Sequence, residues 1–231
     1  MAQRLNPLQI HVEGRNDLYA LVNLLIRHGV NYDQKPWPDT FPKFSAAMSD
    51  SDDPTREEAG VEAMLKAIPD EVAIQSGRTV GFVLDADADC LQRWQEVRLK
   101  LNQVGVDSPD KPEVDGFIGE SVKYKTRVGV WLMPDNGSVG ALEHFLEKLV
   151  PTASPLYDFA RACTIQSQQS PYDATFREVD QLKATLACWL AWQKNPGRPY
   201  GTGIRAGYFG KDSPEARKFV AWFKDLFHID S

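Results

Sequence analysis

Acidic residues gather directly after two apolar segments of this sequence, at spacings that let them act together. Glu13 follows one segment, and the apolar run at residues 79–84 ends in Asp85, Asp87 and Asp89, separated only by alanines. Alternate residues of an extended segment point the same way, so the three aspartates can converge. Crowded carboxylates raise one another's pKa unless a cation neutralises them. Oxygen ligands of this kind favour Mg²⁺ or Mn²⁺, and the sequence therefore predicts a metal site.

Both acidic motifs also have a purely structural interpretation. Residues 85–89 would then form a solvated loop in which Asp89 caps the next helix, because aspartate is a preferred N-cap residue. Glu13 would merely start a turn at Gly14, and Asn16 or Asp17 would cap the helix that follows. Taken one by one, the motifs leave both interpretations open.

The elements that must position these acids alternate between strand and helix. Apolar runs and alternations predict strands at residues 8–12, 79–84 and 127–133, with a short further strand at 44–48. Helical recurrence of apolar residues predicts helices at 18–28, 57–68, 90–104 and 139–150. This alternation implies an α/β fold with a mostly parallel sheet. Ligand-binding groups of such sheets lie where the strands end, so Glu13, Asp85 and Asp135 are expected at one edge.

The character of the chain changes after Pro151. We expect residues 1–150 to form the α/β domain and residues 151–231 to form a helical extension packed on it. Helices are predicted at 156–162, 176–193 and 213–227. The glycine-rich segment at 201–207 follows a proline-rich turn rather than a buried strand, so we interpret it as a flexible hairpin or loop, not a dinucleotide site.

Taken together, the two acidic motifs are more specific than either one. Their order is strand–Glu-Gly-x-x-Asp–helix and later strand–Asp-x-Asp–helix. This order resembles the TOPRIM domain of topoisomerases, primases and OLD-family nucleases over about residues 8–150. The chain looks most similar to small bacterial and phage TOPRIM-like proteins known mainly as uncharacterised families, which share a Pro-Asp-Asn turn and a later Leu-Glu pair. The resemblance implies a Rossmannoid, TOPRIM-like sheet flanked by helices.

The resemblance also implies roles for the acidic residues. Glu13 corresponds to the TOPRIM glutamate, a general acid or base, and Asp85 and Asp87 correspond to the pair that holds Mg²⁺ or Mn²⁺. Such a metal polarises a phosphate, and a nearby glutamate with a raised pKa can shuttle a proton. From its place on an amphipathic helix, Lys183 is a candidate contact for the scissile phosphate, although an exposed lysine is the default. The remaining candidates are Asp89 as a further metal ligand and Asp17, Asp135 and Glu143 as supporting residues.

Our working hypothesis is a Mg²⁺-dependent, nuclease-like phosphodiester-processing protein related to phage or defence systems. The sequence carries no Walker A signature, no zinc module and no tyrosine that stands out as a nucleophile. Two other classes stay open. A Mn²⁺-dependent nucleotide-sugar transferase would use the Asp-x-Asp pair, and a non-catalytic TOPRIM-derived binding protein would use the fold alone.

Composition bears on partners and compartment. The formal charge is −6, with 32 acidic and 26 basic residues, whereas nucleic-acid-binding proteins usually carry a basic excess. Nucleic acid therefore remains a candidate partner, but one not held mainly by net charge. Three scattered cysteines suit a reducing compartment, and no secretory or membrane segment is recognisable, so a cytoplasmic protein is expected. The oligomeric state stays open, a homodimer included.

Overall fold

The computed structural model describes residues 7–32, 41–46, 57–74 and 76–229, and its centre is a five-stranded sheet. The strand order is β2-β1-β3-β5-β4, in which only β4 runs antiparallel. The strands are β1 (Leu8–Val12), β2 (Lys43–Ala46), β3 (Thr79–Asp85), β4 (Phe117–Glu120) and β5 (Arg127–Met133). This confirms the predicted α/β class and the mostly parallel sheet. β4 was not predicted because it is a short, half-buried edge strand without clear alternation.

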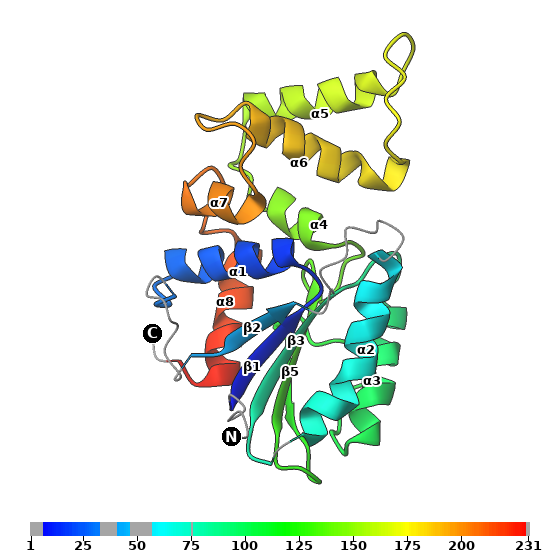
Figure 1. The fold of residues 1–231 in the computed structure, drawn as a ribbon, viewed down its shortest axis with the longest axis vertical. Helices are drawn as coiled ribbons and strands as arrows, with labels where there is room; N and C mark the ends of the chain where they lie inside the picture. The colour runs from blue at the N-terminus through cyan, green and yellow to red at the C-terminus, as the bar shows by residue number, and fades with distance from the viewer. Residues whose placement is uncertain (1–6, 33–40, 47–56, 75, 230–231) are drawn as a thin grey trace, which may run out of the picture.

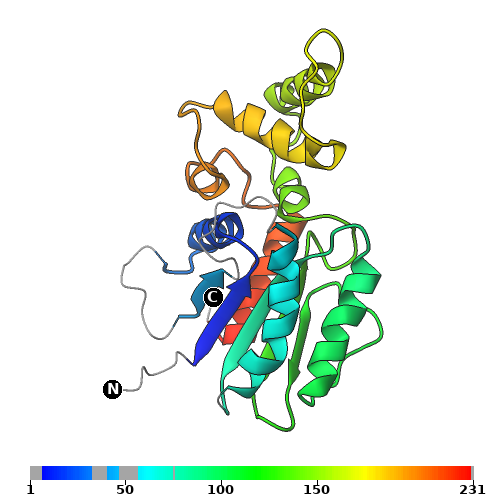
Figure 2. The same ribbon diagram turned by 45° about the vertical axis from the view of Figure 1, so that its right-hand side comes forward.

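Helices cover both faces of the sheet (Figures 1 and 2). One face carries α2 (Glu57–Ala73) and α3 (Cys90–Gln103), and the other carries α1 (Arg15–Arg27) and α8 (Pro214–Phe227). The middle strands β3 and β5 are buried along nearly their whole length. Coverage from both sides explains why these strands are almost unbroken apolar runs rather than alternating ones.

Two glycines let α8 approach the sheet closely. Gly81 and Gly129 are register partners on β3 and β5. A Cβ atom added to Gly129 would lie within 3.0 Å of both Leu226 and Trp222 of α8, and one added to Gly81 would lie 3.0 Å from Leu226. The indole N–H of Trp222 also donates to the carbonyl of Phe117, at 3.1 Å. Side chains at the two glycines would therefore push α8 away.

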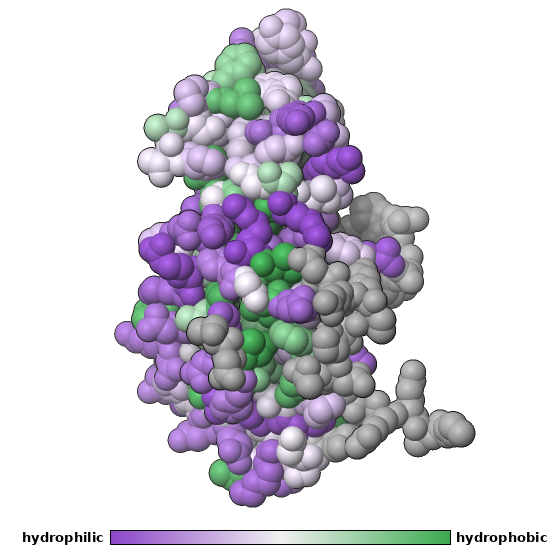
Figure 3. Space-filling model, turned by 90° about the vertical axis from the view of Figure 1, so that its left-hand side faces the viewer, coloured by the Kyte–Doolittle hydropathy of each residue, from purple (hydrophilic) through white to green (hydrophobic). Residues whose placement is uncertain are grey.

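Helices α5 and α6 of the C-terminal segment lie at the end of the molecule away from the sheet (Figure 1). α5 (Pro155–Ser167) packs against α6 (Gln181–Ala191), which a single 3₁₀ turn (Glu178–Asp180) precedes. Figure 3 shows apolar residues at the surface of this end, where the exposed rings of Phe159 and Trp192 lie 5.3 Å apart. The division into domains near residue 150 stays a prediction, but α8 from this segment is one of the helices that cover the sheet.

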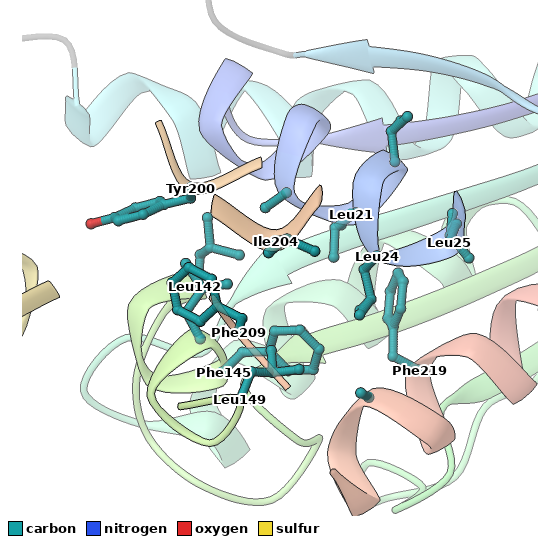
Figure 4. Packing of buried hydrophobic residues seen from close by; sticks show 14 of the residues in the cluster. Leu21, Leu24, Leu25, Leu142, Phe145, Leu149, Tyr200, Ile204, Phe209 and Phe219 are labelled. Atoms are coloured by element: carbon teal, nitrogen blue, oxygen red, sulfur yellow. The ribbon is translucent and has the colours of Figure 1, made fainter. Parts of the chain in front are cut away.

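The interpretation of residues 201–207 as a flexible hairpin or loop was wrong. Tyr200–Arg205 forms helix α7, which packs against α1. Gly201 approaches the backbone of Tyr19 so closely that a Cβ would lie 2.4 Å from its carbonyl oxygen, and Gly203 lies against Leu190. These glycines serve close packing between helices, which a sequence signal for backbone freedom does not reveal. Figure 4 shows the apolar cluster that joins α1, α4 (Leu142–Glu147), α7 and α8.

Several helix boundaries also differ from the prediction, those of α4 and α2 among them. α4 starts at Leu142 rather than residue 139, because Gly140 adopts φ 131° and bonds to another loop. α2 continues past Pro69 to Ala73 instead of ending at residue 68. No helix in the described ranges combines the length and the apolar character needed to cross a membrane.

The close approach of α8 makes a specific prediction for stability. Replacing Gly129 by Val should lower the free energy of unfolding by about 1–3 kcal/mol, because the new side chain overpacks Leu226 and Trp222. Denaturant-induced unfolding measures this change. The control is Gly137→Ala, whose Cβ would meet only Asp135, at 3.8 Å, and which should change the free energy by less than about 0.5 kcal/mol. Equal effects of the two substitutions would contradict this packing.

Candidate active site at the carboxyl edge of the sheet

Glu13 and Asp85 meet because their strands are neighbours. β1 and β3 are parallel and adjacent, with Val12 opposite Val83, so the residues that follow them lie side by side. Glu13 Oε1 accepts a hydrogen bond of 2.7 Å from the backbone N–H of Asp85. Its other oxygen, Oε2, faces Gly60 of α2, where an added Cβ would lie 3.6 Å away. The structure therefore joins the two acidic motifs in space.

Asp85 links this pair to the segment after β5. Its Oδ1 accepts a hydrogen bond of 3.1 Å from the N–H of Leu142, the first residue of α4. The next residue, Ala86, donates its own N–H to the carbonyl of Met133, also at 3.1 Å. Asp85 thus connects three elements of the edge: its backbone N–H bonds to Glu13 after β1, the residue ends β3, and its carboxyl group bonds to the start of α4.

Asp87 is held in an unusual backbone conformation. Its φ of 53° lies in the left-handed region that few non-glycine residues adopt. Two backbone hydrogen bonds with Gly140 fix it there: Asp87 donates at 2.9 Å and accepts at 2.7 Å. The side chain remains 52% exposed, and Oδ2 accepts a bond of 2.6 Å from Arg93. The backbone of Asp87 is therefore fixed while its carboxylate faces the surface.

Arg93 is a site residue that the sequence did not predict. It lies in the first part of α3, and only 14% of its side chain is exposed. The guanidinium donates to Asp87, to Glu96 Oε2 at 2.7 Å and, through Nε, to the carbonyl of Asp85 at 3.0 Å. Side chains of a helix lean toward its N-terminus, so a basic residue one turn into α3 was a usable signal.

Asp17 and Glu143 extend the acidic group. Asp17 is the third residue of α1. Backbone hydrogen bonds at Asp17 and at the N-cap Gly14 lower the pKa of its carboxyl group, against the larger effect of burial. Burial raises the pKa of Asp17 to about 7, with a contribution from the charge of Glu143. Glu143, in the first turn of α4, accepts a hydrogen bond of 3.3 Å from the hydroxyl of Tyr200 on α7. The C-terminal segment thus contributes to this edge.

The pKa values of the central carboxyl groups are raised together. Burial is the main reason that the pKa of Glu13 rises to about 8; the Asp85 N–H and Arg93 oppose this rise, while the charges of Asp17 and Asp87 add to it. Burial likewise raises the pKa of Asp85 well above its ordinary value, and the surrounding carboxylates reinforce the shift. At neutral pH the cluster of Glu13, Asp17 and Asp85 therefore retains at least one proton unless a further cation is present.

Three other predicted residues have different surroundings. Asp89 is the N-cap of α3, accepting from the N–H of Gln92 at 2.9 Å, as its structural interpretation predicted.

Asp135 lies at the same edge as Glu13, but its carboxylate binds Lys148 at 2.6 Å and Ser138 within a turn. Burial acts to raise the pKa of Asp135, but these hydrogen bonds outweigh it and the pKa is lowered. Lys183 is exposed on α6, where its charge acts on Asp180.

The donor chemistry of the edge suits a hard divalent cation. Within the described ranges, no three His, Cys, Asp or Glu side chains surround a common point as a complete set of ligands. Mg²⁺ does not need such a set, since it commonly takes one or two protein carboxylates together with waters and substrate phosphates. Asp85 and Asp87 supply two carboxylates, and the pKa of Asp85 is raised first by burial and then by the surrounding carboxylates, whose repulsion a cation would relieve.

Comparison with known proteins identifies a family for this chain. Residues 7–228 match the model of the family described as "Protein of unknown function (DUF3226)". No curated protein and no solved structure matches the chain. Because the family model covers nearly the whole sequence, the chain belongs to this family.

The raised pKa values predict an unusual dependence of stability on pH. In the absence of divalent cations, the free energy of unfolding should fall as the pH rises from about 4.5 to about 8. Over this range folded Glu13 and Asp17 retain protons that the unfolded chain has lost, and stability falls wherever the folded state binds more protons. Denaturant-induced unfolding at a series of pH values tests this.

The variant Glu13→Gln, which cannot ionise, should flatten the fall. The exposed Asp158 on α5 lies outside the acidic group, so Asp158→Asn is the control and should keep the profile of the wild type. A wild-type profile that rises steadily over the same pH range would show that the acidic group is not protonated in the folded protein.

Proposed function

We propose that this chain is a Mg²⁺-dependent phosphodiester-processing protein of the nuclease type, with a TOPRIM-like site at Glu13, Asp85 and Asp87. The observation that carries the proposal is the hydrogen bond between Glu13 Oε1 and the backbone N–H of Asp85. It unites a glutamate with a raised pKa and an Asp-x-Asp pair at the ends of two adjacent parallel strands. That adjacency also supports a TOPRIM-like interpretation of the sheet.

Glu13 has the properties of the proton-transferring group. In the metal-free protein its pKa of about 8 keeps it mostly protonated at neutral pH, and it loses its proton within a range that an enzyme uses. A general acid or base works best when its pKa lies near the operating pH. Glu13 would therefore donate a proton to, or accept one from, an oxygen of a phosphodiester bound beside Asp85.

Asp85 and Asp87 would hold the cation. The carboxylate of Asp85 is positioned by the N–H of Leu142, and the backbone of Asp87 is positioned by its bonds to Gly140. A divalent cation bound there would neutralise the phosphate and lower the pKa of a water molecule. The cysteines Cys90, Cys163 and Cys188 are free thiols, which suits activity in the reducing cytoplasm, where phage or defence nucleases meet nucleic acid.

The variants Glu13→Gln and Asp87→Asn separate proton transfer from metal binding. Glu13→Gln should lower the rate of oligonucleotide cleavage about 100- to 10,000-fold while Mg²⁺ still binds, because only the proton-transferring group is lost. Asp87→Asn should weaken Mg²⁺ binding itself. Cleavage assays on DNA and RNA oligonucleotides measure the first effect, and thermal unfolding with MgCl₂ measures the second.

Thermal unfolding also provides a scale for metal binding. A ligand that binds only the folded state adds about 2.7 kcal/mol of stability at a hundredfold excess over its dissociation constant. The exposed Asp158 is far from the motifs along the chain, so Asp158→Asn should behave like the wild type in both assays.

Two experimental outcomes would contradict this proposal, and each would favour a different function. If Mg²⁺ binds but no nucleic acid is cleaved, and Glu13→Gln has no phenotype, the chain is a TOPRIM-derived binding protein. If Mn²⁺ and a nucleotide-sugar together stabilise the fold and nucleic acid does not, the Asp-x-Asp pair serves a sugar transferase.

A further inference from the structure

The guanidinium of Arg93 occupies one carboxylate oxygen of Asp87, a residue proposed to hold the cation. Its Nη2 is 2.6 Å from Asp87 Oδ2, at the short end of charge-assisted hydrogen bonds. A cation that coordinated the same oxygen would have to displace this contact. Arg93 therefore competes with a metal that coordinates Oδ2 of Asp87.

Arg93 has a second carboxylate that can keep it in place. Glu96 Oε2 accepts from Nη1 at 2.7 Å, and the carbonyl of Asp85 accepts from Nε at 3.0 Å. The bond to Asp87 can break while these two remain. The backbone of Asp87 is separately fixed by Gly140, so releasing its carboxylate requires no movement of the loop.

A small cavity adjoins this contact. It has a volume of about 130 Å³ and is lined by Asp87, Asp89, Gln92, Arg93 and Glu96, among others. Because one water molecule needs only about 10–15 Å³ of such space, the cavity holds several waters, which leaves room for a phosphate group. Three of the named lining residues are acidic, and Arg93 is the one that attracts a phosphate.

We propose that Arg93 is a latch on Asp87 that the phosphate of the substrate releases. The inference rests on the proposed function and adds an order of binding to it. A phosphate that enters the cavity takes the guanidinium in a bidentate pair, which arginine forms well with phosphate oxygens. Asp87 then becomes free to bind Mg²⁺. Arg93 would thus bind the substrate and couple the binding of metal to the presence of substrate.

The latch has a consequence that binding measurements can detect. If the phosphate strengthens Mg²⁺ binding, Mg²⁺ must strengthen phosphate binding by the same factor. For the wild type we expect weak Mg²⁺ binding alone and an affinity about tenfold higher when an oligonucleotide is present. Without the guanidinium, Mg²⁺ alone should bind about tenfold more tightly than to the wild type, and the oligonucleotide should add little.

The experiment is a thermal-unfolding titration with MgCl₂, with and without a short thymidine oligonucleotide that carries cleavage-resistant linkages. The proteins are the wild type, Arg93→Gln and the control Arg98→Gln. Arg98 lies on the same helix and also pairs with an aspartate, Asp110 at 2.7 Å, but it does not line this cavity. If Arg93→Gln does not fold, Arg93→Lys takes its place, since lysine keeps the charge but loses the fork and should lose the coupling.

Tighter Mg²⁺ binding by Arg93→Gln, with wild-type behaviour of Arg98→Gln, supports the latch. The latch is overturned if Arg93→Gln binds Mg²⁺ no better than the wild type, or if the oligonucleotide strengthens binding equally in both. In that case the proposed function still stands, provided that Asp87→Asn abolishes Mg²⁺ binding. If no protein binds Mg²⁺ under either condition, the latch and the proposed metal site fail together.

Discussion

The hydrogen bond from the backbone of Asp85 to the carboxyl group of Glu13 is the contact on which the acidic edge depends. It exists because β1 and β3 are neighbours in the sheet although about seventy residues separate them along the chain. Parallel neighbours end at the same edge, so two acids that follow their strands are brought together by topology alone. The contacts of Asp85 to the start of α4 and of Arg93 to the end of β3 add to this pair.

The buried carboxyl groups at this edge destabilise the folded state when they are ionised. Burial and mutual repulsion raise the pKa values of Glu13, Asp17 and Asp85 together, so their charged forms are disfavoured in the folded state. Arg93 offsets part of the cost, because it brings a positive charge against Asp87 and reaches the backbone of Asp85. Perturbed carboxyl groups of this kind cluster at functional sites, which is why the same residues support the proposed chemistry.

The C-terminal segment is tied to this edge by more than its covalent connection. α8 rests on the glycines of the middle strands, and α7 lies against α1 through Gly201. From α7, Tyr200 reaches Glu143, whose charge acts on both Asp17 and Asp85. A change in these helices would therefore be felt at the acidic edge through packing and through charge.

The sequence by itself determined the features that depend on neighbouring residues. The apolar runs gave β1, β3 and β5, the helical periodicity gave α1, α3 and α8, and the N-cap preference gave the place of Asp89, because these patterns are local. Tertiary structure alone decided which charged side chains meet. It bound Asp135 to Lys148 and packed a glycine-rich segment as helix α7. The partner of such a side chain depends on which elements pack together, and spacing along the sequence does not predict that packing.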